Sequence, residues 1–365
     1  MRLSHLCVLA ALALAPCAAH AAAGPYAMAD FPRVRKFDAH VHANVADGVL
    51  LGLLRKDNFE ALSINVDYPD FPSIARQAAV AERLRARDPV RFHYATTFSM
   101  TGFGQPGWTA RTGRAIARAK ARGAVAVKIW KNVGMVETDK DGHRIFIDDE
   151  RFDPLIARIV ALRLPLIAHQ GEPKNCWLPL DQMTTDNDRE YFSAHPQYYM
   201  HLHPDQPSYE TLMAARDRFV ARHPELSFVG AHLASLEWSV DELSAFLDRY
   251  PKATVDLAAR MSQVQVQSVA DYAKVRAFFI RYQDRLMYGT DLSDNPGDDP
   301  AGFARDAESM WRSDWRYLAT GESQPIKDIH AAPKGLALPR SVIDKIYYRN
   351  ARRVFLGGGS LRSAR

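Results

Sequence analysis

The sequence has few cysteines: three in 365 residues, at positions 7, 17 and 176. Cys7 and Cys17 lie in an N-terminal segment that we expect to be cleaved, which leaves Cys176 as the one thiol of the mature chain. A single thiol cannot form an internal disulfide. The fold must therefore be stabilised by its core, and a chain of this length can bury enough apolar surface to do so.

Several other features are missing from the sequence. No apolar run is long enough to cross a bilayer as a helix, so we expect no membrane span. No G-x-G-x-x-G or Walker A loop is present to cradle a nucleotide phosphate. The net charge is +5, but the 47 Lys and Arg residues alternate with 42 acidic residues and form no basic stripe. This pattern disfavours nucleic acid as a partner and leaves a small-molecule substrate.

The N-terminus has the pattern of an export signal. Arg2 precedes an apolar run at 6–15, and an Ala-x-Ala site follows at 19–21. We therefore predict that residues 1–23 are a cleaved signal peptide and that the protein is periplasmic or secreted. Residues 14–17 loosely resemble a lipoprotein cleavage box, but Pro16 occupies a position where a small residue is expected. Lipid attachment at Cys17 is therefore the lesser alternative.

The rest of the chain alternates short apolar segments with amphipathic helical ones, without an internal repeat. The apolar segments predict strands at 34–42, 61–66, 91–98, 124–130, 164–169, 226–232, 253–257 and 285–291. Eight strand–helix units favour a single α/β (β/α)₈ TIM barrel over a doubly wound sheet. We assign the barrel to residues 24–356, with insertions after strands 5 and 8, and a flexible tail to 357–365.

The first predicted strand ends in His40 and His42. Side chains two residues apart on a strand project to the same face, so these imidazoles should point together. Converging imidazoles are typical of a zinc site. An isolated His-x-His pair is more often two partly exposed histidines on a strand, so the interpretation depends on further ligands elsewhere in the chain.

Further residues of this kind occur where later strands end. In a TIM barrel the carboxyl ends of all strands meet at one face, which carries the active site. Each histidine alone is better explained as an ordinary core or surface residue, but the ordered set predicts a metal site. The residues are Lys128 on strand 4, His169 on strand 5, His232 on strand 6 and Asp291 on strand 8.

This ordered set resembles the amidohydrolase superfamily. The motifs at 37–42, 230–232, 288–291 and 348–355 are similar to those of its amidohydrolase-2 branch, which includes metal-dependent decarboxylases and lactone hydrolases. The resemblance covers the whole mature chain and implies that one divalent metal, which we predict to be zinc, is held by His40, His42, His169 and Asp291.

The resemblance also implies catalytic roles. A bound metal lowers the pKa of water from about 15.7 to roughly 7. Asp291 would accept a proton from that water, and His232 would orient or deprotonate the water or polarise a substrate carbonyl. In two-metal members of the superfamily, strand 4 carries a carboxylated lysine and the strand-6 histidine is a ligand. We favour one metal, with Lys128 contacting substrate, because this branch is usually mononuclear.

Three further predictions concern residues outside this set. Glu172 either reaches the pocket or belongs to a turn. Arg260 either binds a substrate carboxylate or, as we favour, forms a surface salt bridge. The insertion at 172–207, which includes His195 and His203, is interpreted as a lid or as the contact of a homodimer.

The sequence thus predicts a metal-dependent hydrolase that cleaves an ester, lactone or amide bond of a small molecule. A non-oxidative, metal-dependent decarboxylase of a small carboxylated substrate is the alternative within the same family. A non-catalytic ligand-binding barrel is the weakest alternative, because no ligand type is missing from the set.

Overall fold

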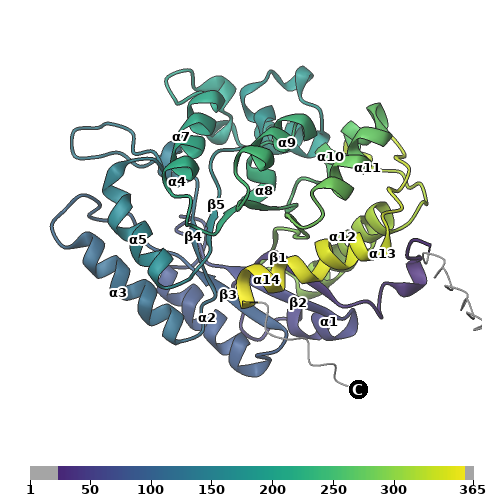
Figure 1. Cartoon of the computed structure of the whole chain (residues 1–365), viewed down its shortest axis with the longest axis horizontal. Helices are drawn as coiled ribbons and strands as arrows, with labels where there is room; N and C mark the ends of the chain where they lie inside the picture. The colour runs from purple at the N-terminus through teal and green to yellow at the C-terminus, as the bar shows by residue number, and fades with distance from the viewer. Residues whose placement is uncertain (1–23, 358–365) are drawn as a thin grey trace, which may run out of the picture.

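The computed structural model describes residues 24–357. The predicted signal peptide and positions 358–365 of the predicted tail lie outside the described residues. The strands form one parallel sheet in the order β8-β7-β6-β5-β4-β3-β2-β1-β9, and helices lie around the outside of it (Figure 1). The strands are β1 Lys36–Ala43, β2 Phe59–Ile64, β3 Phe92–Thr96, β4 Ala126–Ile129, β5 Leu166–Ala168, β6 Phe228–Gly230, β7 Thr254–Asp256, β8 Leu286–Met287 and β9 Leu292–Asp294.

β8 and β9 are two parts of the eighth barrel strand. β8 pairs with β7, and β9 pairs with β1. Between them, the Ala39 amide donates to the Tyr288 carbonyl at 2.9 Å and the Asp291 amide donates to the His40 carbonyl at 2.8 Å. These bonds join the last strand to the first, so the predicted single (β/α)₈ barrel is confirmed.

The helices follow the strands in the alternating order that a barrel requires. Those that follow β1 to β4 are α1 Leu50–Lys56, α2 Ile74–Arg87, α3 Trp108–Ala121, the short α4 Asn132–Met135 and α5 Asp153–Ala161. Those that follow β5 to β9 are α6 Asp186–Ala194, α7 Tyr209–Arg222, α8 Ala231–Ala234, α9 Val240–Arg249, α10 Met261–Ala270, α11 Tyr272–Arg281, α12 Pro300–Ala319, α13 Arg340–Asp344 and α14 Asn350–Leu356. Short 3-10 turns occupy Met28–Asp30, Glu150–Phe152 and Lys327–Ile329.

Between β5 and α7 the chain forms α6 and a series of 3-10 turns: Lys174–Trp177, Leu180–Gln182, Pro196–Tyr198 and Met200–Leu202. Cys176, Met183, Phe192 and Tyr199 form a small hydrophobic cluster of their own in this segment. Cys176 is buried, and burial raises the pKa of its thiol. This segment therefore has an ordered core and is not a plain loop.

Two elements lie outside the predicted strand–helix pattern. Helix α10, which begins at Met261, precedes α11 between β7 and β8. Strand β9, which follows β8, pairs with β1. In addition, the closing helical segment contains a π-helical stretch, Lys345–Arg349, between α13 and α14.

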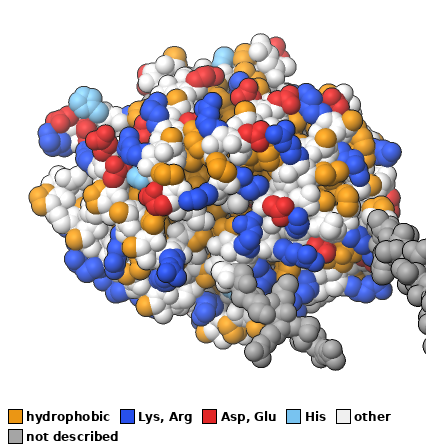
Figure 2. Space-filling view, in the orientation of Figure 1, with side chains coloured by type: hydrophobic (Ala, Val, Ile, Leu, Met, Phe, Trp, Pro, Cys, Tyr) orange, Lys and Arg blue, Asp and Glu red, His pale blue; other side chains and the backbone are white. Residues whose placement is uncertain are grey.

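The barrel interior is filled by apolar side chains. Apolar side chains from successive strands pack below the C-terminal face, among them Phe37, Leu62, Ile167, Val229 and Met287. On the face shown in Figure 2, basic side chains are scattered among acidic and apolar ones. Across positions 24–357, no helix has the length and apolar character needed to cross a bilayer.

Candidate metal centre

All six predicted strand-end residues line one cavity of about 450 Å³ at the C-terminal face of the barrel. They lie at, or directly after, the ends of strands that are far apart in the sequence, as the barrel rule requires. The six are His40 and His42 in β1, Lys128 in β4, His169 after β5, His232 after β6 and Asp291 between β8 and β9. The structure therefore brings the predicted residues together.

A shift of register within β1 directs its histidines into this cavity. The pairing of β1 with β2 is irregular between Asp38 and Val41. Phe37 before the irregularity and Ala39 within it pack in the interior cluster, whereas Val41 after it packs in the larger hydrophobic cluster of the protein. A β-bulge re-aims side chains in this way next to active sites. Without the shift, the histidines would share the face of Asp38, whose carboxylate accepts a bond from Trp311 at 3.0 Å.

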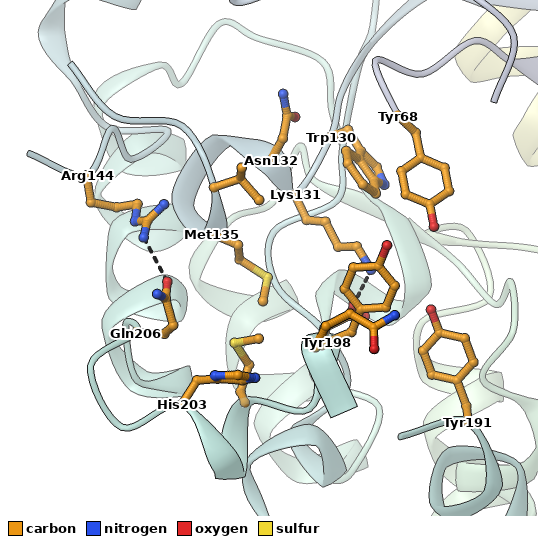
Figure 3. A pocket seen from close by; sticks show the side chains of 14 residues that line it. Tyr68, Trp130, Lys131, Asn132, Met135, Arg144, Tyr191, Tyr198, His203 and Gln206 are labelled. Atoms are coloured by element: carbon orange, nitrogen blue, oxygen red, sulfur yellow. Dashed lines mark hydrogen bonds and ion pairs between the residues drawn. The ribbon is translucent and has the colours of Figure 1, made fainter. Parts of the chain in front are cut away.

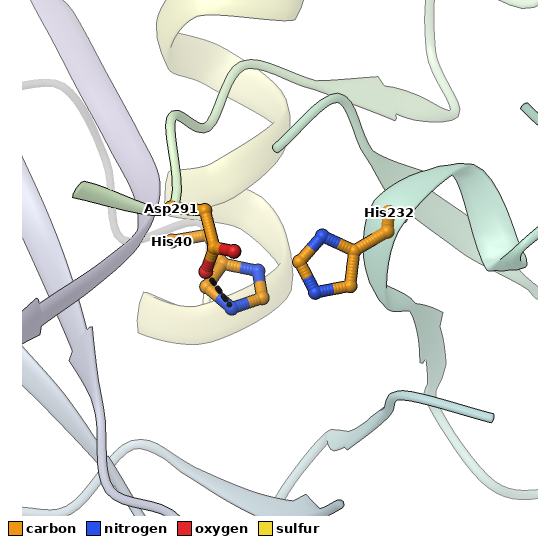
Figure 4. Close-up of side chains that lie close together, drawn as sticks. All are labelled: His40, His232 and Asp291. Carbon is orange, nitrogen blue, oxygen red and sulfur yellow. Dashed lines mark ion pairs between the residues drawn. The ribbon is translucent and has the colours of Figure 1, made fainter. Parts of the chain in front are cut away.

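The Asp291 carboxylate lies against both β1 histidines. Its Oδ1 is 3.3 Å from His40 Nε2 and 3.2 Å from His42 Nε2. Asp291 has a φ of 72° at the break between β8 and β9, a conformation that costs energy for a residue other than glycine. His40, His232 and Asp291 each place a ligand atom within 4.8 Å of the others, and Figure 4 shows the three side chains close together. The strained backbone of Asp291 indicates a functional constraint on this residue.

Hydrogen bonds fix which nitrogen of each imidazole faces the cavity. His40 Nδ1 lies 3.0 Å from Asp256 Oδ2, and His42 Nδ1 lies 2.7 Å from the Ile64 carbonyl. His232 Nδ1 lies 2.9 Å from the Ala258 carbonyl. These oxygens can only accept, so in each neutral ring Nδ1 carries the hydrogen and Nε2 presents a lone pair.

These donors fit a divalent metal ion. Lone pairs of His40 and His42 and a carboxylate oxygen converge, and such acceptors repel one another unless a cation or proton lies between them. The Nε2 atoms of His40 and His169 are buried without a hydrogen-bond partner in the described chain. Burial lowers the pKa of His40, His169 and His232, which keeps these imidazoles neutral and able to donate lone pairs.

His169 lies beside His232 in the cavity. Its ring centroid is 4.2 Å from that of His232, and the His40 and His232 centroids are 4.7 Å apart. His232, not His169, completes the compact group with His40 and Asp291. Both histidines line the cavity, so both are within the region where a metal and its water would bind.

The backbone at His232 is unusual. Residues 232–235 all have φ between 55° and 57°, which forms a left-handed turn at the end of β6. Such a run is costly for residues other than glycine. Gly230 permits it, because a Cβ at this position would lie 2.5 Å from the Cβ of Ala234. The turn places the His232 ring over the barrel mouth.

Asp256, at the end of β7, is a site residue that the sequence reasoning missed. Besides its contact with His40, its Oδ1 accepts the His232 amide at 2.8 Å and the Ala258 amide at 3.2 Å. Burial acts to raise the pKa of Asp256, but His40 and the bonds it accepts hold that pKa below its usual value. Its position as a carboxylate at a strand end was the available signal.

Lys128 is buried beside the histidines. Burial lowers the pKa of its ammonium to about 8, although Asp256 and Asp291 oppose this shift. Among residues 24–357, no carboxylate lies within ion-pair distance of this ammonium. The positive charge of Lys128 therefore faces the cavity without a carboxylate partner.

Arg260 and Glu172 also line the cavity. Arg260 is only 7% exposed, and its guanidinium has no ion-pair partner in the described part of the chain. The surface salt bridge favoured from the sequence is therefore wrong: the end of β7 directs Arg260 inward. Glu172 is buried and forms an ion pair with Lys131 at the cavity edge.

Comparisons with known proteins agree with this architecture. The model of a family described as Amidohydrolase matches residues 37–356. A search of curated proteins gives no match. Among solved structures, 2,6-dihydroxybenzoate decarboxylase from Rhizobium is similar with 15% identity and a TM-score of 0.51, covering 89% of this chain and 100% of that chain. The same enzyme in complex with 2,6-dihydroxybenzoate gives the same values.

A zinc-bound amidohydrolase from Burkholderia multivorans is similar with 14% identity and a TM-score of 0.44. That comparison covers 88% of this chain and 99% of the other. At these identities, the similarity to the Rhizobium structure shows a shared fold.

Proposed function

This chain belongs to the amidohydrolase family, and from that premise we propose that it is a metal-dependent hydrolase that cleaves an ester, lactone or amide bond of a small molecule. The observation that carries the proposal is the contact of the Asp291 carboxylate with the Nε2 atoms of His40 and His42, with the His232 ring beside them. This group combines metal ligands with two proton acceptors in one cavity.

We assign His40, His42, His169 and Asp291 as the residues that hold the metal, and zinc as the metal. When bound, such an ion supplies Lewis acidity and makes water acidic enough to react at neutral pH. Imidazole nitrogens and carboxylate oxygens are the donors that catalytic zinc sites use. Asp256 fixes the ring of His40 and thereby its Nε2 lone pair.

The chain's own residues move the proton. His232 Nε2 presents a lone pair because Nδ1 donates to the Ala258 carbonyl. Asp291, whose pKa is held well below its usual value by the neighbouring histidines despite its burial, is ionised. Either group can take the proton from an attacking water and return it to the leaving oxygen or nitrogen.

Lys128 and Arg260 supply positive charge to the same cavity. Both are buried, and neither is paired with a carboxylate in the described chain. Buried charges without partners are costly, so they are expected to bind an anionic group of the substrate. This observation also favours the second candidate, a non-oxidative decarboxylase of a small carboxylated substrate.

One assay separates the two reactions. The zinc-loaded protein is incubated with panels of lactones, esters, amides and aromatic carboxylates, and both acid production and CO₂ release are measured. A hydrolase gives new acid without CO₂, whereas a decarboxylase gives CO₂. Absence of both products across the panels, with metal bound, would support the non-catalytic barrel.

We further propose that residues 1–23 direct export to the periplasm or beyond, and that the segment at 172–207 contributes to a homodimer. Fractionation of expressing cells tests the first proposal. Sedimentation analysis of the purified protein tests the second, and a monomer at all concentrations would contradict it.

A further inference from the structure

A second cavity, of about 420 Å³, adjoins the cavity of the metal centre. We call it the outer cavity. Figure 3 shows the side chains that line it. The two cavities have five lining residues in common, which form their boundary: Tyr68, Trp130, Lys131, Glu172 and Tyr191. A molecule bound at the metal centre can therefore extend into the outer cavity.

A continuous row of aromatic rings lines the passage from the metal centre into the outer cavity. The ring of His42 lies 5.1 Å from that of Phe71, and Phe71 lies 5.3 Å from Tyr68. Tyr68 in turn lies 4.6 Å from Trp130, measured between centroids. Planar aromatic ligands pack well against such rings, edge to face or offset-stacked. The row thus begins at a predicted metal ligand and ends in the outer cavity.

The outer cavity is aromatic on the side near the metal centre and carries a positive charge, Arg144, on the far side. Tyr68 and Trp130 lie at one side of Figure 3 and Arg144 at the opposite side, with Met135 between them. Arg144 is half-buried, and its Nη2 donates to Gln206 Oε1 at 2.7 Å. No carboxylate within the described range lies close enough to pair with it. Lys131, by contrast, is already neutralised by Glu172.

The segment inserted between β5 and α7 builds much of this cavity. It contributes Tyr191, Tyr198, Met200, His203 and Gln206, while Met135, Val136 and Arg144 come from the region after β4. Val136 is 65% exposed and Tyr191 40% exposed, so apolar surface is left uncovered at the rim. Uncovered apolar surface next to a catalytic cavity is typical of ligand-binding regions.

We propose that the outer cavity binds the part of the substrate remote from the scissile bond, and that this part is an aryl group carrying an anionic substituent. The aryl group packs against Tyr68, Trp130 and Tyr198, and the anion pairs with Arg144. The proposal rests on the proposed function, since it defines the substrate class of that same centre. According to this proposal, the segment between β5 and α7 determines which substrates bind.

Binding of two simple probes tests the proposal without requiring turnover. The probes are 2-naphthoate and its neutral amide, 2-naphthamide, titrated calorimetrically into the full chain in zinc-loaded and metal-stripped form. We expect 2-naphthoate to bind both forms with similar affinity. Arg144→Gln should weaken 2-naphthoate roughly fivefold or more and leave 2-naphthamide unchanged, because only the carboxylate pairs with the guanidinium.

A second variant and a control complete the design. Met135→Trp should fill the outer cavity and weaken both probes, and its folding is verified by circular dichroism. Arg111→Gln removes the same charge from an exposed position on α3, outside both cavities, and should change nothing. Equal affinity of 2-naphthoate for wild type and Arg144→Gln would overturn the proposal.

Two further outcomes separate this proposal from the proposed function. Loss of 2-naphthoate binding on metal removal, or in Arg260→Gln but not in Arg144→Gln, would place the probe at the metal centre and overturn the outer-cavity proposal alone. If the protein takes up no zinc after zinc loading but still binds 2-naphthoate, the outer-cavity proposal is supported and the metal centre is contradicted.

Discussion

At the scale of single residues, Asp256 is a positioning residue for the metal centre. Its Oδ2 accepts a hydrogen bond from His40 Nδ1, and its Oδ1 accepts one from the His232 amide. Asp256 therefore fixes both the ring of His40 and the backbone turn at His232. Partners of this kind hold metal-binding histidines in the correct tautomer.

We therefore predict that Asp256→Asn weakens zinc binding by roughly 10- to 100-fold. The amide cannot stabilise the same tautomer of His40 as strongly as the carboxylate does. Zinc affinity, measured by competition with a chromogenic chelator, provides the readout. Asp248→Asn, a surface change on α9, is the control, and equal zinc affinities of the two variants would refute the role of Asp256.

Lys128 permits a second prediction at this scale. If Lys128 contacts substrate, Lys128→Gln should leave the metal content unchanged and raise KM for anionic substrates about tenfold. If Lys128 is carboxylated and bridges two ions, the metal content of the variant should fall. Parallel metal analysis and kinetics distinguish these outcomes, and a loss of metal would contradict the mononuclear assignment.

The metal-binding strand-end residues were predicted from the sequence, whereas Asp256 offered only its position at a strand end and the outer cavity offered no signal. Each of His40, His169, His232 and Asp291 ends a recognisable apolar run, and the barrel rule brings such ends together. Asp256 acts through a histidine 216 residues away, and that contact has no sequence signature. The outer cavity depends on how the segments that follow β4 and β5 pack against each other, which local patterns do not encode.

At the scale of elements, the left-handed turn after β6 is the most demanding part of the scaffold. Gly230 allows the chain to fold back on Ala234, and no larger residue fits without displacing backbone atoms 3.0 Å away. This requirement explains the glycine of the motif that precedes His232.

Gly230→Ala should therefore destabilise the protein by about 1–3 kcal/mol through overpacking. Gly52→Ala is a matched control on α1, where an added Cβ has no atom within 4 Å. That change should stabilise the protein by roughly 0.5–1 kcal/mol, because alanine favours the helix. Urea unfolding of both variants gives the comparison, and a Gly230→Ala protein as stable as wild type would contradict the argument.

Helix α10 shows why some elements escape sequence analysis. In its sequence Val264 and Val266 alternate with glutamines, a period-2 pattern typical of a strand. The structure instead buries Gln263, whose amide donates to Asp188 at 2.7 Å. Tertiary hydrogen bonds satisfy the polar side chains and override the local pattern. Strands such as β5 and β6, which are buried apolar runs, were recognisable for the opposite reason.

At the scale of the whole molecule, closure of the barrel depends on the region where β8 and β9 meet β1. Tyr288, just after β8, donates its hydroxyl to Asp314 of α12 at 2.9 Å. Burial raises the pKa of Asp314 from 3.8 to about 7. The folded protein therefore holds this proton more tightly than the unfolded chain does.

The sign of the resulting pH dependence follows from linkage. The stabilisation from protonated Asp314 is complete below about pH 4 and is lost as the pH rises through about 7. Asp314→Asn keeps an oxygen to accept from Tyr288 but cannot ionise. We predict that this variant gains stability relative to wild type between pH 4 and 8, on the order of a few kcal/mol. Urea unfolding across this range tests the prediction, and parallel pH profiles would contradict it.

The central claim is that the C-terminal face of the barrel holds a metal ion, and metal content tests it most directly. Plasma mass spectrometry of purified protein should find about one zinc ion per chain in wild type. His40→Ala and Asp291→Ala should lose most of it. His143→Ala, which alters an exposed histidine near Asp139 and Asp141, should retain it. Zinc content that is unchanged in His40→Ala and Asp291→Ala, or absent from wild type after zinc loading, would contradict the account.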